Sequence, residues 1–82
     1  MIKNIKVKIA QKEKKQLKIT TGFIRLDSAL KLADIAGTGG ISKIIIQNGE
    51  IKVNGEVCLQ RGKKLRAGDS FEFENKIYEI IG

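Results

Sequence analysis

The chain has 82 residues, of which 41% are hydrophobic and 30% charged, a composition that indicates a single small globular domain and excludes a disordered chain. Its 16 lysines and arginines outnumber its 9 aspartates and glutamates, and a net charge of +7 favours a polyanionic partner. The chain has no histidine and one cysteine, Cys58, which excludes an internal disulfide, a cysteine–histidine dyad and a zinc site.

The positive charge is concentrated in two parts of the chain. Residues 1–26 contain eight cations and one carboxylate, and residues 41–66 contain six cations and two carboxylates. Residues 67–82, by contrast, contain one cation and four carboxylates. Because uniform solubilising charge would not segregate in this way, the distribution favours a basic binding surface.

The N-terminal segment shows the alternation of a β-strand. Ile5, Val7 and Ile9 alternate with lysines, so we expect a strand over residues 5–9 with one lysine-rich face. Residues 11–16 are polar and are expected to form a turn or an exposed connection, after which residues 17–24 are expected to return as a second strand. The lysines have two open interpretations: they protect an edge strand from aggregation, or they bind the partner directly.

A first helix is expected over residues 28–36. Asp27 is its candidate N-cap, because a carboxylate accepts hydrogen bonds from the unpaired amides of a first helical turn. The expected apolar face consists of Ala29, Leu30, Leu32, Ala33 and Ala36.

The sequence Gly37-Thr38-Gly39-Gly40 then breaks the helical pattern and has two interpretations. One is a tight connection between two helices, which uses the conformational freedom of glycine. The other is an anion site, in which Thr38 caps the second helix and backbone amides at its N-terminus face a phosphate. On its own the structural interpretation is the simpler one, because the loop lacks the Walker pattern and follows a helix instead of a strand.

A second helix is expected over residues 41–47, ending at Asn48-Gly49. The residues expected to face the core recur at helical spacing: Ile41, Ile44 and Ile45. Ile46 falls outside this face, and Lys43 and Gln47 are expected on the opposite side. Three consecutive isoleucines have poor helix propensity, so a strand is the alternative, but the flanking glycines favour the helix.

The rest of the chain is expected to form β-structure around a basic loop. Ile51 and Val53 alternate with Lys52 in a half-buried strand, which the turn dipeptide Asn54-Gly55 ends. Residues 60–66 hold the densest group of cations, for which a solvated loop is the simplest interpretation. Residues 71–74 and 77–81 are expected to form the closing hairpin, with these core residues: Phe71, Phe73 and Ile80.

The order of these motifs resembles the RNA-binding domain named after small-subunit ribosomal protein S-four. Arg25-Leu26-Asp27 matches the triplet that opens the first helix of that family. Residues 49–55 match a second family motif, in which a glycine ends the second helix and a strand follows. Gly68-Asp69 matches a later pair before the closing strand. Leu30 to Asp34, Gly39-Gly40 and residues 61–65 are most similar to the small stand-alone YaaA-like branch. The resemblance covers residues 19–73.

The resemblance implies an α+β fold, in which two short helices pack on a small, mainly antiparallel sheet with an added N-terminal strand or hairpin. It divides one domain into a basic N-terminal arm (1–18), a core (19–73) and a closing strand (74–82). It also implies a basic RNA-binding face. When the binding positions of the family are carried over to this sequence, they fall on these residues: Arg25, Lys31, Thr38, Gly39, Gly40, Lys43, Lys52, Arg61, Lys63, Lys64 and Arg66. Many members carry serine and arginine where Thr38 and Gly39 stand, so backbone amides would have to replace that arginine here. The resemblance favours the anion interpretation of this loop.

The leading hypothesis is a non-catalytic RNA-binding module for structured RNA, with ribosomal RNA as a candidate. Aromatic residues make up 5% of the chain, which argues against stacking on unpaired bases and for recognition of shape and phosphate. The alternatives are a ubiquitin-like sulfur or protein carrier and a ribosome-associated protein-interaction adaptor. We expect a cytoplasmic monomer without enzymatic activity, metal, cofactor, small-molecule substrate or membrane association.

Overall fold

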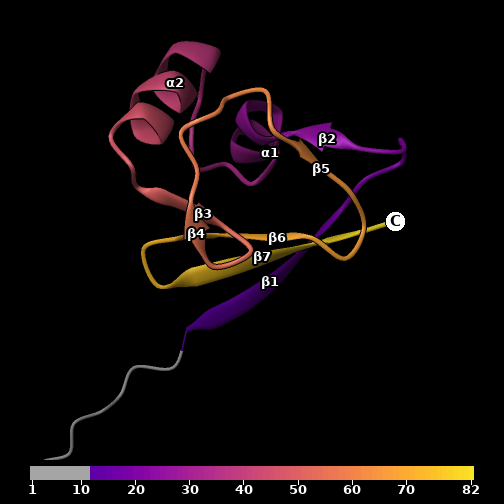
Figure 1. The fold of residues 1–82 in the computed structure, drawn as a ribbon. Coiled ribbons are helices and arrows are strands. Elements are labelled where there is room, and N and C mark those ends of the chain that lie inside the picture. Colours follow the sequence, from indigo (N-terminus) through magenta and orange to yellow (C-terminus); the bar gives the residue numbers. More distant parts are fainter. Residues whose placement is uncertain (1–11) are drawn as a thin grey trace, which may run out of the picture.

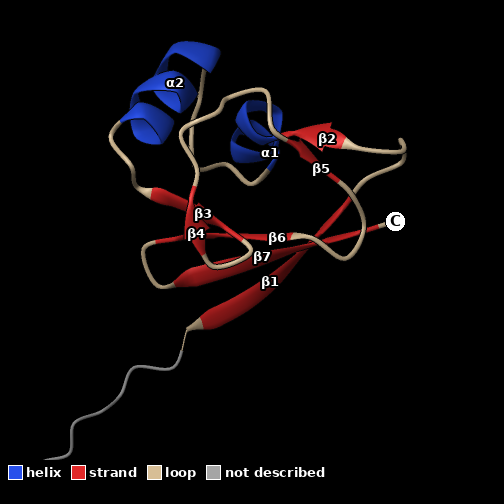
Figure 2. Ribbon diagram, viewed as in Figure 1, coloured by secondary structure: helices blue, strands red, loops and turns tan. Residues whose placement is uncertain are grey.

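Two short helices pack against one face of a five-stranded sheet (Figures 1 and 2). The computed structural model describes residues 12–82 of the chain. The helices are α1 (Leu26–Leu32) and α2 (Gly39–Gln47), and the strands are β1 (Glu13–Lys18), β2 (Ile24–Arg25), β3 (Ile51–Val53), β4 (Glu56–Val57), β5 (Lys64–Leu65), β6 (Ser70–Phe73) and β7 (Lys76–Ile81). The expected α+β fold is confirmed.

The five-stranded sheet has the order β1-β7-β6-β3-β4 and is antiparallel except for the pair β1–β7, which is parallel. β2 and β5 form a separate antiparallel pair, here called the β2–β5 ribbon. Figure 1 shows this ribbon beside α1, at the level of the helices and above the large sheet in that view. The ribbon and the start of α1 therefore belong to the same part of the molecule.

The hydrophobic core lies between the helices and the large sheet. Leu26, Leu30 and Ile46 of the helices are fully buried, and the rings of Phe71 and Tyr78 stack beneath them with centroids 4.9 Å apart. The remaining buried hydrophobic residues are Leu17, Ile19, Ala29, Ala36, Ile51, Val53, Leu65 and Ile80. Two of the three residues that the sequence places in the core from the last hairpin, Phe71 and Ile80, are buried there, and Phe73 packs half-buried against it.

The turn or exposed connection expected over residues 11–16 is wrong in the part that the structure describes, because residues 13–16 belong to a strand. Residues 13–18 form β1, which runs beside β7 from the pair Glu13↔Lys76 to the pair Lys18↔Ile81. In β1 every side chain except that of Leu17 is exposed, because the strand lies at the edge of the sheet. An edge strand of this composition shows no alternation of polar and apolar residues, so periodicity cannot identify it. The strand expected over residues 5–9 lies outside the described residues.

The second strand expected over residues 17–24 is also wrong. β1 ends at Lys18, a bend follows, and β2 comprises Ile24 and Arg25 alone. The hydroxyl of Thr21 donates to the carbonyl of Phe23 at 2.7 Å, which stabilises the bend locally. β2 pairs with β5, some forty positions later in the chain, and a local sequence pattern does not indicate such a distant partner.

Helix α1 begins two residues earlier than expected and ends earlier as well. Its N-cap is Arg25, which makes no side-chain cap, and Asp27 lies inside the first turn, where its Oδ1 accepts from the amide of Ser28 at 2.8 Å. Asp27 as N-cap is therefore wrong. After the C-cap at Ala33, Asp34 takes a left-handed φ of 62° and the helix stops. Leu32, expected in the core, is 54% exposed.

Helix α2 forms where it is expected, but it turns a different face to the core. Thr38 caps it by accepting from the amide of Ile41 at 3.2 Å, and Gly49, with φ of 76°, follows its end. The buried side chains are Ser42 and Ile46, both 0% exposed, whereas Ile41 and Ile44 are 46% and 58% exposed. The Ser42 hydroxyl donates to the carbonyl of Asp27 in α1 at 3.2 Å. Ser42 and Ile46 lie one turn apart on the same side of α2, so this side faces α1 and the core.

The turn expected at Asn54-Gly55 is confirmed, with left-handed φ values of 51° and 92° at these two residues. It joins β3 to β4, and the closing hairpin expected from residue 71 onward is confirmed as β6 and β7. Asp69 connects the Asn54-Gly55 turn to the turn before β6. Its Oδ2 accepts from the amide of Arg66 at 2.8 Å, and its Oδ1 accepts from the side chain of Asn54 at 3.2 Å. The hydrogen bond from the amide of Arg66 is the main cause that lowers the pKa of the Asp69 carboxyl below its ordinary value of 3.8. Partial burial has the opposite effect and raises this pKa, but it does not outweigh the lowering.

We expect Asp69→Ala to lower the free energy of unfolding by about 2 kcal/mol, because two accepted hydrogen bonds are lost. Since the pKa of Asp69 is lowered on folding, its contribution to stability is fully present above pH 3.8 and is lost as the pH falls through the folded-state pKa. Urea denaturation of both proteins at neutral and acidic pH measures this effect, and the difference between them should shrink below pH 3.8. Glu56→Ala removes an exposed carboxylate of β4 and serves as the matched control. A loss of stability at Asp69 that stays constant down to strongly acidic pH would contradict this role.

Candidate nucleic-acid interface

The basic loop between β4 and β5 is bound to the start of α1 through its backbone. The amide of Leu26 donates to the carbonyl of Lys63 at 2.8 Å, and the amide of Asp27 donates to the carbonyl of Arg61 at 3.1 Å. Amides at the start of a helix have no acceptor within the helix, so these carbonyls satisfy two of them. The loop is thereby held in place, although Arg61 and Lys63 expose their side chains to solvent.

Arg25 packs across this loop. Its Nη2 lies 3.1 Å from Asp27 Oδ2, and a Cβ built on Gly62 would lie 3.5 Å from the same nitrogen. A Cβ at position 62 would make ordinary van der Waals contact with the guanidinium group, so Arg25 lies directly against the loop backbone at Gly62. The Arg25 side chain remains 53% exposed, and part of its hydrogen-bonding capacity faces solvent.

The β2–β5 ribbon adds two more cations to this region. Lys64 stands opposite Arg25 in the ribbon, and Arg66 follows β5 directly. Five exposed cations thus lie on the two segments, distant in sequence, that meet at the start of α1. We refer to them as the basic face: Arg25, Arg61, Lys63, Lys64 and Arg66.

Helix α2 adjoins the basic face through the hydrogen bond from Ser42 to the carbonyl of Asp27. Lys43 follows Ser42 and is exposed. At the N-terminus of α2, Thr38, Gly39 and Gly40 are also exposed, and the amides of a first turn have no acceptor within the helix. The structure therefore places Lys43 one residue from the contact between the helices and leaves the loop before α2 open to solvent.

The structure does not join two of the expected residues to the basic face. Lys52 lies in β3 between Ile51 and Val53, which are buried under the helices. Because side chains alternate along a strand, Lys52 points to the opposite side of the sheet, next to Glu72 in the register of β3 and β6. Lys31 lies exposed in the last turn of α1, away from the helix start that the loop contacts.

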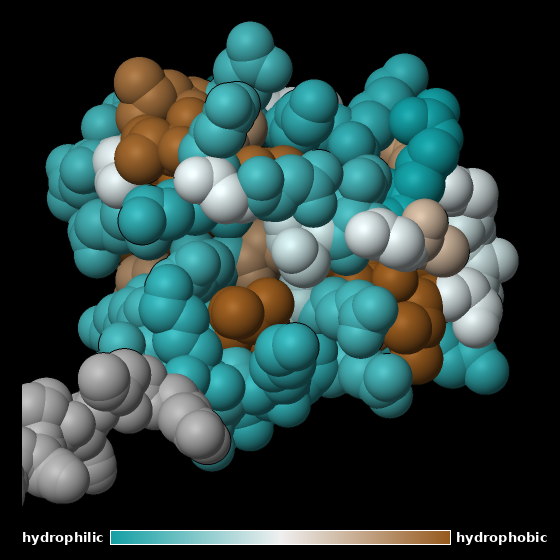
Figure 3. Space-filling view, turned by 60° about the horizontal axis from the view of Figure 1, so that its bottom comes forward, coloured by the Kyte–Doolittle hydropathy of each residue, from teal (hydrophilic) through white to brown (hydrophobic). Residues whose placement is uncertain are grey.

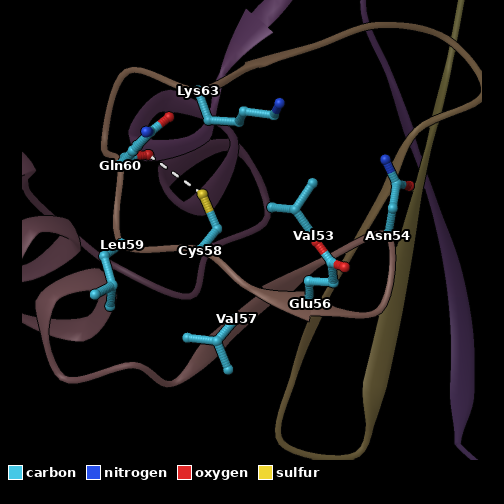
Figure 4. A pocket seen from close by; sticks show the side chains of 8 residues that line it. All are labelled: Val53, Asn54, Glu56, Val57, Cys58, Leu59, Gln60 and Lys63. Atoms are coloured by element: carbon cyan, nitrogen blue, oxygen red, sulfur yellow. Dashed lines mark hydrogen bonds between the residues drawn. The ribbon is translucent and has the colours of Figure 1, made fainter.

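A hollow lies beside the β3–β4 turn and is shown in Figure 4. Lys63 lies along its upper rim in that view, and the thiol of Cys58 donates to the carbonyl of Gln60 at 3.8 Å. The hollow contains one carboxylate, Glu56, and one cation, Lys63, which already belongs to the basic face, so the hollow adds no further positive charge to that face. Cys58 is half-buried and packs against the core, which accounts for it as a structural residue.

The surface of the described residues is mixed in character. Figure 3 brings the bottom of the Figure 1 view forward and shows a largely hydrophilic face with small, separate hydrophobic patches. Within residues 12–82, no helix is long and apolar enough to cross a membrane. The same part of the chain contains no group of three or more cysteine, aspartate or glutamate side chains that could hold a metal ion.

The two-helix fold, with a basic loop bound to the start of its first helix, defines an S4 domain. The family model of the S4 domain matches residues 17–81, and the chain belongs to this family. The probable ribosome maturation protein RlbA of Bacillus subtilis (strain 168) is 41% identical over 58 residues, which cover 71% of this chain and 82% of RlbA. The S-four resemblance is thus confirmed.

A solved structure has the same fold. It is the solution structure of YbcJ from E. coli, a protein described as having a motif involved in RNA-binding. The TM-score is 0.61 with 22% sequence identity, and the match covers 98% of this chain and 100% of YbcJ. At this level of identity the likeness shows the fold.

Phe23 lies near the basic face and is not among the residues that the sequence predicts there. It falls within the strand expected over residues 17–24, but its side chain is 39% exposed beside Lys64 and Arg66. Strand alternation could have indicated this position. Phe23 and Arg25 are two positions apart and so lie on the same side of an extended segment, whereas Ile24 lies on the opposite side.

Proposed function

We propose that the protein is a non-catalytic module that binds structured RNA through its basic face, aided by Lys43 and by the amides of Thr38, Gly39 and Gly40. The observation that carries this proposal is the docking of the loop carbonyls of Arg61 and Lys63 on the start of α1. It anchors the backbone of the loop that carries Arg61 and Lys63 beside Arg25, whose guanidinium group lies across the same loop. Cations carried on an anchored backbone can match a particular arrangement of phosphates, and folded RNA is recognised largely by its shape and phosphates.

The charge and the hydrogen-bonding groups of the basic face suit phosphate better than a neutral ligand. Arginine presents a planar fork of donors to phosphate oxygens, and lysine acts as a point charge. The pairing of Arg25 with Asp27 orients the guanidinium group but leaves it half exposed. Lys31 and Lys52 are not included in the proposal, because the structure does not place them with the other cations.

Membership of the S4 domain family favours RNA binding over the carrier and adaptor alternatives. The name of RlbA, a probable ribosome maturation protein, supports ribosomal RNA as the ligand. We further propose that a single copy of the chain binds this RNA in the cytoplasm. Crosslinking in cells followed by sequencing tests this part of the proposal, with ribosomal RNA fragments expected in excess. If the protein were instead an adaptor, partner proteins would stay bound in a pull-down after nuclease treatment.

We expect the affinity for RNA to depend strongly on salt. Each neutralised phosphate contributes about −0.7 to −0.9 to the slope of log K against log salt, so four engaged cations give a slope of about −3 to −4. Between 50 mM and 200 mM salt the affinity should then fall by about a hundredfold. Fluorescence anisotropy with a labelled RNA hairpin measures this slope. A titration in which affinity hardly changes with salt would show that the cations do not contact phosphates.

A further inference from the structure

The β2–β5 ribbon presents an aromatic ring together with three cations. Its register pairs Ile24 with Leu65 and Arg25 with Lys64. Leu65 is fully buried and Ile24 packs half-buried against the core, so this side of the ribbon points inward. Side chains alternate along a strand. The outward side therefore carries the residues at the neighbouring positions: Phe23, Arg25, Lys64 and Arg66.

Phe23 differs from the other aromatic residues of the chain. Phe71 and Tyr78 stack in the core and Phe73 packs against it, whereas Phe23 is 39% exposed. Lys64 Nζ lies 4.9 Å from the centroid of the Phe23 ring, and Arg66 Cζ lies 5.9 Å from it. The core is complete without Phe23, because Ile24 and Leu65 supply the inward contacts of the ribbon. An exposed ring between flexible cations is the arrangement that proteins use for single-stranded nucleic acid.

We propose that Phe23 stacks on an unpaired base of the bound RNA, while Lys64 and Arg66 contact the phosphates next to that base. The inference rests on the RNA-binding function proposed above and extends it from folded RNA in general to RNA with an unpaired nucleotide beside its folded part. It revises the expectation, drawn from the low aromatic content, that the protein does not stack on unpaired bases.

The relative strength of the contacts explains how the ring becomes available. Stacking of a base on an aromatic ring is stronger than a cation–π contact at an exposed site. The base therefore replaces the cations at the ring. Lys64 and Arg66 have long, flexible side chains, and their charged groups move to the phosphates, which bind them more strongly than the ring does.

The charges around Phe23 favour a nucleotide over a protein segment. Three cations share the outward side of the ribbon, and the neighbouring carboxylate of Asp27 is already paired with Arg25. A protein partner would have to bring several carboxylates, whereas an RNA strand carries a phosphate at every nucleotide. If a protein occupied this surface, removal of the ring would leave the affinity for RNA unchanged.

The experiment compares the full chain with Phe23→Leu, which keeps an apolar side chain without the ring, and Phe23→Trp, which keeps a ring. Two RNA probes are used: a hairpin with a short unpaired uridine tail, and a blunt duplex with the same number of phosphates. We expect Phe23→Leu to weaken binding to the tailed hairpin about tenfold and to leave binding to the duplex unchanged. Phe23→Trp should retain the affinity of the unmodified chain for both probes.

Fluorescence gives an independent readout, because the chain has no tryptophan. The emission of the Phe23→Trp variant should be quenched by the tailed hairpin and not by the duplex. The proposal is overturned if Phe23→Leu weakens binding to both probes equally or to neither, or if bound tailed RNA leaves the emission unchanged. Failure of the unmodified chain to bind either probe would instead overturn RNA binding itself. If circular dichroism shows that Phe23→Leu is misfolded, the emission of the tryptophan variant decides.

Discussion

Ile46→Asp should leave the chain unfolded at room temperature. Ile46 is 0% exposed and lies in the core at the side of α2 that faces α1. Burying an unpaired carboxylate there costs several kcal/mol, and small domains have a total stability of about 5–15 kcal/mol, toward the lower end for a chain of this size. Circular dichroism and thermal melting measure the loss directly.

The matched control is Ile44→Asp, two positions earlier in the same helix. Ile44 is 58% exposed, so the new carboxylate stays in water and the melting temperature should change little. Ile45 is half-buried, and Ile45→Asp is expected to fall between the two. The three variants therefore measure the rotation of α2 about its axis. Equal destabilisation by Ile44→Asp and Ile46→Asp would show that the helix faces the core differently.

The second large effect is expected for RNA binding. Alanine at Arg61, Lys63 and Lys64 together should reduce the affinity for a structured RNA about a hundredfold or more at moderate salt, because three phosphate contacts are lost. The backbone carbonyls that bind the start of α1 remain in this variant, so the fold is expected to persist. Anisotropy titrations at fixed salt, with circular dichroism as a folding check, provide the measurement.

The control removes the same number of charges elsewhere. Alanine at Lys12, Lys14 and Lys15 changes the β1 end of the large sheet, far from the β2–β5 ribbon in Figure 1. Lys12 pairs with Glu72, whose carboxylate is partly buried while the lysine side chain is 45% exposed; a pair so open to solvent is worth about 1 kcal/mol, so stability should change little. At physiological salt a charge acts over about 8 Å, and lysines on β1 should matter little to RNA at the basic face. Similar losses of affinity in both triple variants would show that binding follows net charge alone.

Local signals predicted much of the fold because they act within a few residues. Gly49 and Asn54-Gly55 adopt the left-handed backbone that their residue types favour, and they end α2 and β3 where expected. The cap at Thr38 also follows from the residues next to it. The loop cations could be predicted as a group because Arg61, Lys63, Lys64 and Arg66 are close in sequence.

Features that depend on distant partners could not be predicted in the same way. The inward side of α2 carries Ser42, a small polar residue that a hydrophobic pattern does not mark and that forms a hydrogen bond to α1. β1 exposes nearly all of its side chains, so its pairing with β7 leaves no trace in its own sequence. The contact of Arg25 with Gly62 joins residues that are far apart in sequence. Lys52 lies on the opposite side of the sheet from the helices, and this position follows from strand alternation only when the sheet itself is known.

The parallel pairing of β1 with β7 has a consequence for how the chain folds. These two six-residue strands come from opposite ends of the described chain, so their contacts have a high contact order and close a long loop. During synthesis β1 leaves the ribosome long before β7 does, and it has no partner in the interval. The helices and the β3–β4 turn need only nearby residues and can form earlier. We therefore expect β1 to join the sheet last, and exposed lysines on an edge strand disfavour pairing with other chains while the strand has no partner.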